Sequence, residues 1–410
     1  MKLQILDITT TKFNTTLFNA TAHIEGEPYW VRPLRPHLEE IGVDIVIAPF
    51  DKIDKSKNWF ISLAPLSWNW NDYNDSLLSD FTEEIQHELM YGNAHLIINH
   101  ECESFTVSFI ARIYESLKKS PIDPNKIIYM VAAPDVHSTY ERFVSDHRLL
   151  NHQKIQLMST CHVYKNFSYP LSVFDYNRTA KKEKKFLSLN RTGRDHRIMF
   201  VSLLAYYDLI DYGYVSMGIH QEDVENTRRE LHQTVNLDKE VLLGFDLIRD
   251  KLPLKIDDVD LRENQFKVNS LPTSFYEKSY FSVVSSTFAL TYKEPSVGFT
   301  EKELKPILYK HPFIIHNLPG VLKHLKLMGF MTFSKWFDES YDDEKDDYKR
   351  LNKIVQEVAR LSKISDLEWD KMLREMEPIL LHNFNRLTKY NSEHSFFNSD
   401  LKNFLYYVGQ

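Results

Sequence analysis

Ala94-His95-Leu96-Ile97-Ile98-Asn99 is a short, nearly continuous apolar run, and residues 43–49 and 126–132 form two more such runs. Runs of this length and composition predict strands that are buried on both faces. Amphipathic stretches at residues 80–91 and 106–118 separate the runs and predict helices. Because buried strands alternate with helices, we expect a parallel sheet that is covered on both sides.

The second half of the chain repeats this alternation. Strands are predicted at residues 186–190, 280–285 and 312–315, and helices at residues 196–207, at 301–310 and from Pro319 onward. An acidic stretch at 338–347 and helices within 348–388 close the chain. The fold class that follows is α/β, with two Rossmann-like doubly wound domains facing a cleft and C-terminal helices.

The domain junction is predicted near residue 180, which gives domains at 1–180 and 181–410. A length of 410 residues favours two cores over one. The charge run Lys181-Lys182-Glu183-Lys184-Lys185 lies at this junction and predicts a solvated linker.

Composition restricts the class of protein. Aromatic residues make up 13% of the chain, which argues against disorder, and a net charge of −7 gives no general attraction to a polyanion. The two cysteines, Cys102 and Cys161, exclude a disulfide framework and fit a reducing compartment. No segment has the roughly 20 apolar residues of a membrane span, and the N-terminus lacks a signal-peptide pattern. We therefore expect a cytoplasmic protein.

The first candidate site is the polar turn Asn190-Arg191-Thr192-Gly193-Arg194, which follows the predicted strand at 186–190. Arg197 lies in the helix that comes next. Strand ends that open onto helix N-termini bind phosphate in open α/β sheets, and arginine adds bidentate bonds to oxygen. An exposed basic loop capped by Asp195 is the alternative.

The second candidate site is Val297-Gly298-Phe299-Thr300-Glu301-Lys302-Glu303-Leu304-Lys305-Pro306. Thr300 and Glu303 have the spacing of a capping box, which explains both residues without a ligand. A diphosphate leaving group needs positive charge, and a ribose needs a carboxylate to accept hydrogen bonds from its hydroxyls. Lys302 and Glu301 offer these two groups.

The run at 299–307, with His311-Pro312-Phe313-Ile314-Ile315 and Leu318-Pro319-Gly320 after it, resembles the donor site of fucosyltransferase-like glycosyltransferases. The resemblance covers roughly residues 180–360 and extends to uncharacterised bacterial and viral members. It implies the GT-B architecture and a nucleotide-sugar donor with no other cofactor. By this resemblance Arg191, Arg194 or Arg197 would contact the diphosphate together with Lys302, and Glu301 would hold the ribose. Phe313 departs from the valine of many members, and no motif of the family is found in the N-terminal half.

The acceptor site and the catalytic base are expected in the N-terminal domain. Glu101 and Glu103 follow the predicted strand at 94–99, with His100 beside them, and are the first candidates for a general base. Asp135 and His137 are the second choice. A loop that caps the following helix would also explain the glutamates.

Two further patterns allow two interpretations each. Asp258-Val259-Asp260 has a form that can hold a metal-bound diphosphate, but its acidic surroundings favour a solvated loop, and we expect no metal. The second pattern is a group of aromatic residues, which can stack on sugars or pack in a surface loop. Its members are Trp68, Trp70 and Tyr73, with Trp59 before them.

The sequence thus predicts an inverting, metal-independent glycosyltransferase that uses a nucleotide sugar and a glycan or other hydroxyl acceptor, in a bacterial or virus-infected cell. One alternative is transfer to modified bases of viral DNA through a basic groove of Lys118, Lys119 and the lysines of 181–185. A second is a non-catalytic adaptor that binds nucleotides or glycans. The sequence leaves the oligomeric state open.

Overall fold

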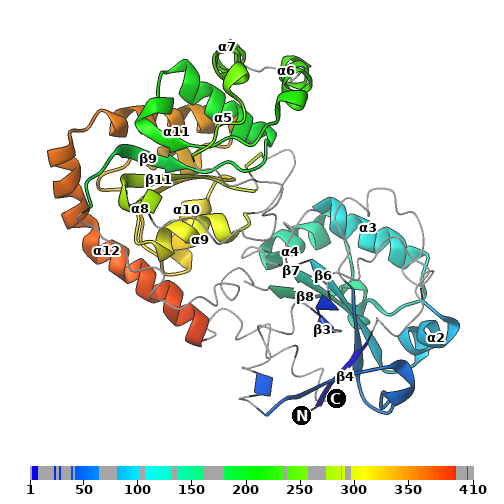
Figure 1. The fold of residues 1–410 in the computed structure, drawn as a ribbon. Helices are drawn as coiled ribbons and strands as arrows, with labels where there is room; N and C mark the ends of the chain where they lie inside the picture. Colours follow the sequence, from blue (N-terminus) through cyan, green and yellow to red (C-terminus); the bar gives the residue numbers. More distant parts are fainter. Residues whose placement is uncertain are drawn as a thin grey trace. The chain divides into compact units, whose positions relative to one another are not determined.

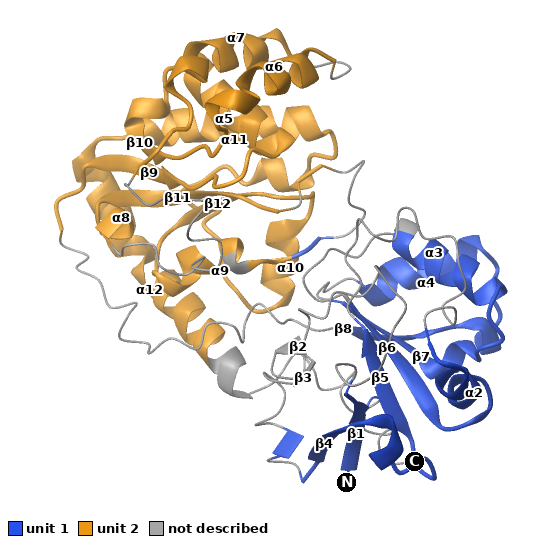
Figure 2. Cartoon of the chain, turned by 45° about the vertical axis from the view of Figure 1, so that its right-hand side comes forward, with its two compact units in different colours: residues 1–168, 294–298, 390–410 blue, residues 169–293, 299–389 orange. Residues whose placement is uncertain are grey.

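The structure is a computed structural model of the 410-residue chain. It describes residues 2–7, 23–24, 27–28, 38–39, 42–63, 81–100, 107–131, 136–159, 180–233, 238–256, 274–287, 289–290, 297–393 and 404. The chain forms two compact units (Figure 2). Unit 1 comprises residues 1–168, 294–298 and 390–410, and unit 2 comprises residues 169–293 and 299–389.

Unit 1 is built on a six-stranded sheet in the order β4-β1-β5-β6-β7-β8, in which every pairing is parallel. Its strands are β1 (Lys2–Leu6), β4 (Asp44–Ala48), β5 (Trp59–Leu63), β6 (Ala94–His100), β7 (Ile127–Val131) and β8 (Gln156–Ser159). Its helices are α2 (Glu83–Tyr91), α3 (Val107–Lys118) and α4 (Val136–Asp146), and a small antiparallel pair joins β2 (His23–Ile24) to β3 (Glu27–Pro28). The predicted parallel sheet is therefore confirmed in this half.

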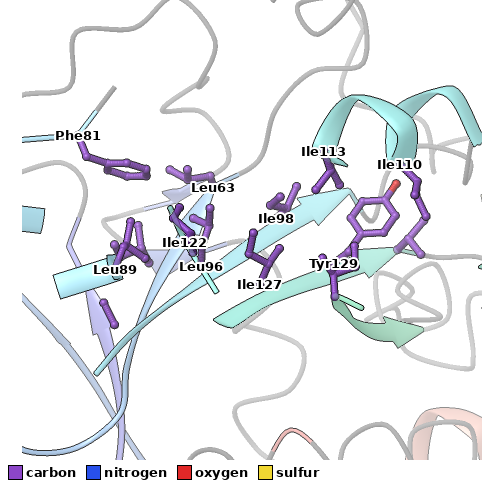
Figure 3. Packing of buried hydrophobic residues seen from close by; sticks show 14 of the residues in the cluster. Leu63, Phe81, Leu89, Leu96, Ile98, Ile110, Ile113, Ile122, Ile127 and Tyr129 are labelled. Atoms are coloured by element: carbon purple, nitrogen blue, oxygen red, sulfur yellow. The ribbon is translucent and has the colours of Figure 1, made fainter. Parts of the chain in front are cut away.

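The two faces of this sheet form separate cores because side chains alternate along a strand. Ile98 and Tyr129 pack with Ile110 and Ile113 of α3 on one face (Figure 3). On the opposite face, Phe60 belongs to a second cluster that also includes Leu3, Ile5, Leu38 and Phe404. Strands that are apolar on both sides thus contribute to two cores.

Unit 2 contains a four-stranded parallel sheet in the order β10-β9-β11-β12. The strands are β9 (Lys184–Ser188), β10 (Gly213–Val215), β11 (Ser279–Ser285) and β12 (Phe313–His316). The helices are α5 (Asp195–Tyr206), α6 (Val224–Gln233), α7 (Lys239–Ile248), α8 (Ser274–Glu277), α9 (Glu301–Leu308), α10 (Val321–Leu327), α11 (Asp347–Ser362) and α12 (Asp366–Glu393). Helices α5 and α11 cover one face of the sheet, while α8, α9 and α10 lie on the other (Figure 1).

Helix α5 is buried on all sides, since ten consecutive residues from His196 to Ala205 are buried. The backbone of α7 approaches it at Gly244, where an added Cβ would lie 1.9 Å from the carbonyl oxygen of Ser202. Only glycine permits this approach. The sheet and α7 together fix the position of α5 and hence of its first turn.

The units do not divide where we expected. The boundary lies at residues 168 and 169 rather than near 180, and residues 390–410 group with unit 1. Phe404 provides a physical reason, because its ring lies 5.4 Å from that of Phe60 in the core of unit 1. Among the described residues, no helix is both long enough and apolar enough to span a bilayer.

The prediction of a solvated linker at residues 181–185 is wrong for most of the run. Lys184 and Lys185 are the first residues of β9. The ammonium of Lys185 donates to the carbonyl of Ile364 at 2.7 Å and to Asp366 at 2.5 Å, and that of Lys182 donates to the carbonyl of Glu277 at 2.6 Å. These lysines attach the start of the sheet to the rest of unit 2.

Candidate functional site

The carboxyl edge of the unit 2 sheet is where a ligand site is expected. The chain passes from β9 to β10 on one side and then returns across β9 to β11, as the order β10-β9-β11-β12 requires. The direction of winding therefore reverses between β9 and β11. Doubly wound sheets bind ligands at the carboxyl ends of strands at such a reversal.

The turn after β9 begins with Asn190, a fully buried residue. Its backbone N–H donates to Ser216 Oγ at 3.0 Å, and its Nδ2 donates to Ser188 Oγ at 3.1 Å. Gly193 lies close to Ile219, so an added Cβ would lie 2.6 Å from the Cγ1 atom of that side chain. The polar turn predicted to bind phosphate is thus held against the region after β10 through its backbone, which donates to the Ser216 hydroxyl and accepts from the N–H of Gly218 at 2.9 Å.

Helix α5 begins without a side-chain cap. Its N-cap residue is Arg194, which makes no side-chain capping bond. The Arg194 guanidinium is exposed and donates from Nη1 to the carbonyl of Thr287 at 3.1 Å. The helix start and the exposed guanidinium favour an anion, while the exposed carboxylate of Asp195 in the same turn opposes it.

Arg197 has a different environment from Arg194, although both were predicted to contact a diphosphate. It is 3% exposed, and its Nε and Nη2 donate to the carbonyl of Ser286 at 3.3 and 2.9 Å. Its Nη1 lies 3.4 Å from the carbonyl of Thr192. Arg197 therefore connects α5 and its preceding turn to the loop after β11. Arg191, on the same turn, is half-buried.

Ser286 is also bonded to the first turn of α5 through His196. His196 Nε2 lies 2.9 Å from the carbonyl of Ser286, and a carbonyl only accepts, so Nε2 carries the proton. Burial is the main cause that lowers the pKa of His196 to about 3. The neutral imidazole thus adds a second fixed contact between α5 and the end of β11.

Helix α9 begins with the predicted capping box, which is confirmed. Glu303 Oε2 accepts from the backbone N–H and the hydroxyl of Thr300, both at 2.7 Å, and Thr300 Oγ1 accepts from the N–H of Lys302 at 3.3 Å. Lys302 and Lys305 are half-buried. Glu301 is the first residue of α9, and its side chain lies outside the described part of the structure.

The end of β12 contributes Asn317, which no motif in the sequence indicated. Its Nδ2 donates to Ser286 Oγ at 3.0 Å and to Glu303 Oε1 at 3.2 Å. Arg350 of α11, 1% exposed, donates to the carbonyls of Asn317 at 3.0 Å and Ala289 at 2.8 Å. The structure thereby connects the turn at 190–197 with the start of α9 through the loops after β11 and β12.

Three buried polar atoms at this edge have no hydrogen-bond partner within the described residues: Asn190 Oδ1, Ser285 Oγ and His316 Nδ1. Ser285 and His316 are register partners in neighbouring strands. Burial lowers the pKa of His316 well below its usual value, so its ring is neutral. An unpaired buried polar group costs about 1–3 kcal/mol, and such groups mark places that water or a ligand completes.

Most of the other predicted site residues lie outside the described residues: Glu101, Glu103, Asp135, Asp258, Asp260, Trp68, Trp70 and Tyr73. His137 is exposed on α4. Trp59 is fully buried in β5, so neither of the two interpretations, stacking on a sugar or packing in a surface loop, describes it. Within the described ranges, no three His, Cys, Asp or Glu side chains are arranged to hold a metal ion.

Comparison with known proteins gives weak similarity only. No protein-family model and no curated protein matches the sequence. Among the solved structures that match, T4 phage BGT in complex with its UDP-glucose substrate has a TM-score of 0.38 and 11% identity, covering 97% of this chain and 99% of that chain. The Glycosylation Associate Protein (Gap123) complex from Streptococcus agalactiae has a TM-score of 0.30 and 10% identity, over 83% of this chain and 55% of that chain. At these TM-scores the matches decide neither fold nor function, and the α/β class rests on the two parallel sheets themselves.

Proposed function

We propose that the chain is a glycosyltransferase of the GT-B type that takes its sugar from a nucleoside diphosphate. The observation that carries this proposal is the uncapped start of α5 beside the exposed Arg194, at the strand-order reversal between β9 and β11. A diphosphate placed there would meet the positive end of the helix dipole and a guanidinium. The fucosyltransferase-like motif at 299–307, in the same unit, supports a nucleotide sugar as the molecule that brings this diphosphate.

The reaction that we propose forms a bond between the acceptor oxygen and the anomeric carbon and breaks the bond from that carbon to the diphosphate oxygen. The acceptor hydroxyl loses its proton to a carboxylate, for which Glu101 or Glu103 is proposed, and attack from the opposite face inverts the anomeric centre. Arg191, Arg194 and Lys302 would neutralise the leaving diphosphate. Glu301 would accept hydrogen bonds from the ribose hydroxyls, and Arg197 would act by holding the turn. The proposed reaction needs no metal, and the proposed location is the cytoplasm.

The alternative of transfer to modified DNA bases is less favoured, because most of the lysines of its predicted basic groove have partners within the protein. Lys182, Lys184 and Lys185 each donate to a backbone carbonyl within unit 2, and Lys118 pairs with Glu115 at 2.6 Å. Cations that are already bonded in this way attract phosphate less than free ones. A steep salt dependence of duplex binding would instead support the DNA acceptor.

A thermal-shift screen with UDP-, GDP-, ADP- and CMP-sugars tests the donor assignment, because a ligand that binds the native state raises its melting temperature. Lys302→Ala should then lose most turnover of the accepted donor, while Lys349→Ala, at an exposed lysine of α11, should retain it. EDTA should leave turnover unchanged. Full turnover by Lys302→Ala would refute the assignment. Donor hydrolysis by the purified protein would exclude the adaptor alternative.

A further inference from the structure

Glu303 is a buried carboxylate that joins the start of α9 to the sheet. Its side chain is fully buried, and three donors reach it: the N–H and hydroxyl of Thr300 at 2.7 Å each, and Asn317 Nδ2 at 3.2 Å. A capping box alone needs only the contacts with Thr300. The third contact connects the helix to the end of β12, which lies 14 residues further along the chain.

Asn317 is the partner on the sheet, and its amide has one consistent orientation. Its Oδ1 accepts from the N–H of Leu318 at 2.6 Å, so Nδ2 is the atom that faces Glu303 and Ser286. The Asn317 backbone is held as well, since Arg350 Nε donates to its carbonyl at 3.0 Å. Asn317 is 1% exposed, so water does not compete for these bonds.

Ser286 extends the same network to α5. Its hydroxyl accepts from Asn317, while its carbonyl accepts from Arg197 Nη2 and from His196 Nε2, both at 2.9 Å. A continuous series of buried hydrogen bonds therefore runs from the first turn of α5 through Ser286 and Asn317 to the first turn of α9. These two turns carry the basic residues of the proposed donor site.

We propose that Asn317 and Glu303 are positioning residues, which together fix the first turn of α9 so that Lys302 faces the donor diphosphate. This inference rests on the proposed function, because it assigns a purpose to the same site. Neither side chain touches the donor; each acts through Thr300 and the backbone of the turn. Their pairing is specific, since a carboxylate accepts where an amide donates.

An exchange of the two groups tests the pairing. Asn317→Asp places two carboxylates against each other, and Glu303→Gln places two amides against each other. The double variant restores one amide opposite one carboxylate in the reverse order. We expect each single variant to weaken binding of the nucleoside diphosphate by about tenfold, and the double variant to recover most of this loss, because contacting pairs couple energetically.

Ser282→Ala is the matched control. Ser282 is 3% exposed in β11 and its hydroxyl lies 2.8 Å from His311 Nδ1, so the variant removes a buried hydrogen bond of the same sheet away from the start of α9. It should lower the melting temperature and leave the dissociation constant unchanged. Single variants that lose stability without losing affinity would overturn the proposal. A double variant whose loss of binding free energy equals the sum of the two single losses would overturn it as well.

Hydrogen exchange at the amides of residues 301–304 separates failure of this inference from failure of the proposed function. If the wild-type protein binds no nucleoside diphosphate, the donor assignment fails, but the exchange measurement still applies. Faster exchange in the single variants and recovery in the double variant would support the positioning role, and unchanged exchange would overturn it. Should Asn317→Asp not fold, a folded Glu303→Gln with wild-type affinity and exchange would overturn it equally.

Discussion

Two arginines three residues apart have different surroundings, although the sequence presents them as equivalents. Arg194 is exposed, and its guanidinium donates to the carbonyl of Thr287. Arg197 is buried and directs its guanidinium to the carbonyls of Ser286 and Thr192. A guanidinium offers five N–H donors, so Arg194 retains donors for a ligand while Arg197 serves the protein.

Arg194→Ala should weaken binding of the donor nucleotide by about ten- to a hundredfold, since a hydrogen bond to a charged group contributes roughly 1.5–3 kcal/mol. Its melting temperature should remain that of the wild type because the side chain is exposed. Titration calorimetry with the nucleoside diphosphate measures the first effect. Arg197→Met is the matched comparison and should lose stability, since it removes buried donors from the Ser286 carbonyl. Equal stability of the two variants would contradict this division of roles.

The sequence predicts the local part of this site and misses the long-range part. Thr300 and Glu303 are three residues apart, so the helix geometry alone brings them together, and their contact could be anticipated. Asn317 meets Ser286 across 31 residues and Arg350 meets Ala289 across 61, and only the folded sheet makes these pairs. Nothing in the spacing of Arg350 distinguishes it from an exposed helix residue. The expected roles of Glu301 and Lys302 remain predictions.

At the scale of elements, α5 depends on one glycine of its neighbour. Gly244→Ala should destabilise the protein by about 1–3 kcal/mol, the usual cost of overpacking a well-packed core. The reason is that the new Cβ would lie 1.9 Å from the carbonyl of Ser202, which is backbone and cannot rotate away. Chemical denaturation measures the loss. Leu243→Ala, at the adjacent residue with 50% exposure, is the control and should change stability little.

The strands that could be predicted were those with a nearly continuous apolar run. Residues 94–99 and 280–285 were expected as strands, and β6 and β11 lie there because their side chains are buried on both faces. Strand β10 was not anticipated, since it has only three residues, Gly213–Val215, and begins with glycine. The charged start of β9 was also missed. Lys184 and Lys185 belong to a strand because tertiary partners accept their ammonium groups, which a local pattern does not reveal.

At the scale of the whole molecule, buried neutral histidines make stability depend on pH. Burial is the main cause that lowers the pKa of His196 and His311 to about 3 and that of His316 well below its usual value. The unfolded chain binds protons at these residues below about pH 6.5, whereas the folded chain does not. The stability that these neutral histidines contribute is therefore fully present above about pH 6.5, and it is lost as the pH falls toward about 3.

Urea denaturation between pH 7.0 and pH 5.0 should show this loss, at up to about 1.4 kcal/mol per pH unit for each histidine. In His311→Asn the free energy of unfolding should change less steeply with pH, because one histidine with a lowered pKa has been removed. His87→Asn, at an exposed histidine of α2, should leave the slope unchanged. A stability that stays constant over this range would contradict the neutral, buried state of these rings.

The two units also differ in what a fragment should be able to do. The sheet of unit 2, the uncapped start of α5, the capping box of α9 and Arg350 all fall within residues 169–389. A fragment of residues 169–389 should therefore unfold cooperatively and bind the donor nucleotide with the affinity of the full chain, because domains carry their own cores.

A fragment of residues 1–168 should be less stable than unit 1 in the full chain, since it lacks Phe404, which packs against Phe60. Circular dichroism melts and calorimetric titration measure both expectations, with Arg194→Ala in the larger fragment as a control that folds and loses affinity. A cooperative melt without nucleotide binding would show that the donor site needs residues of unit 1, whereas a gradual melt would show that the core of unit 2 is incomplete on its own.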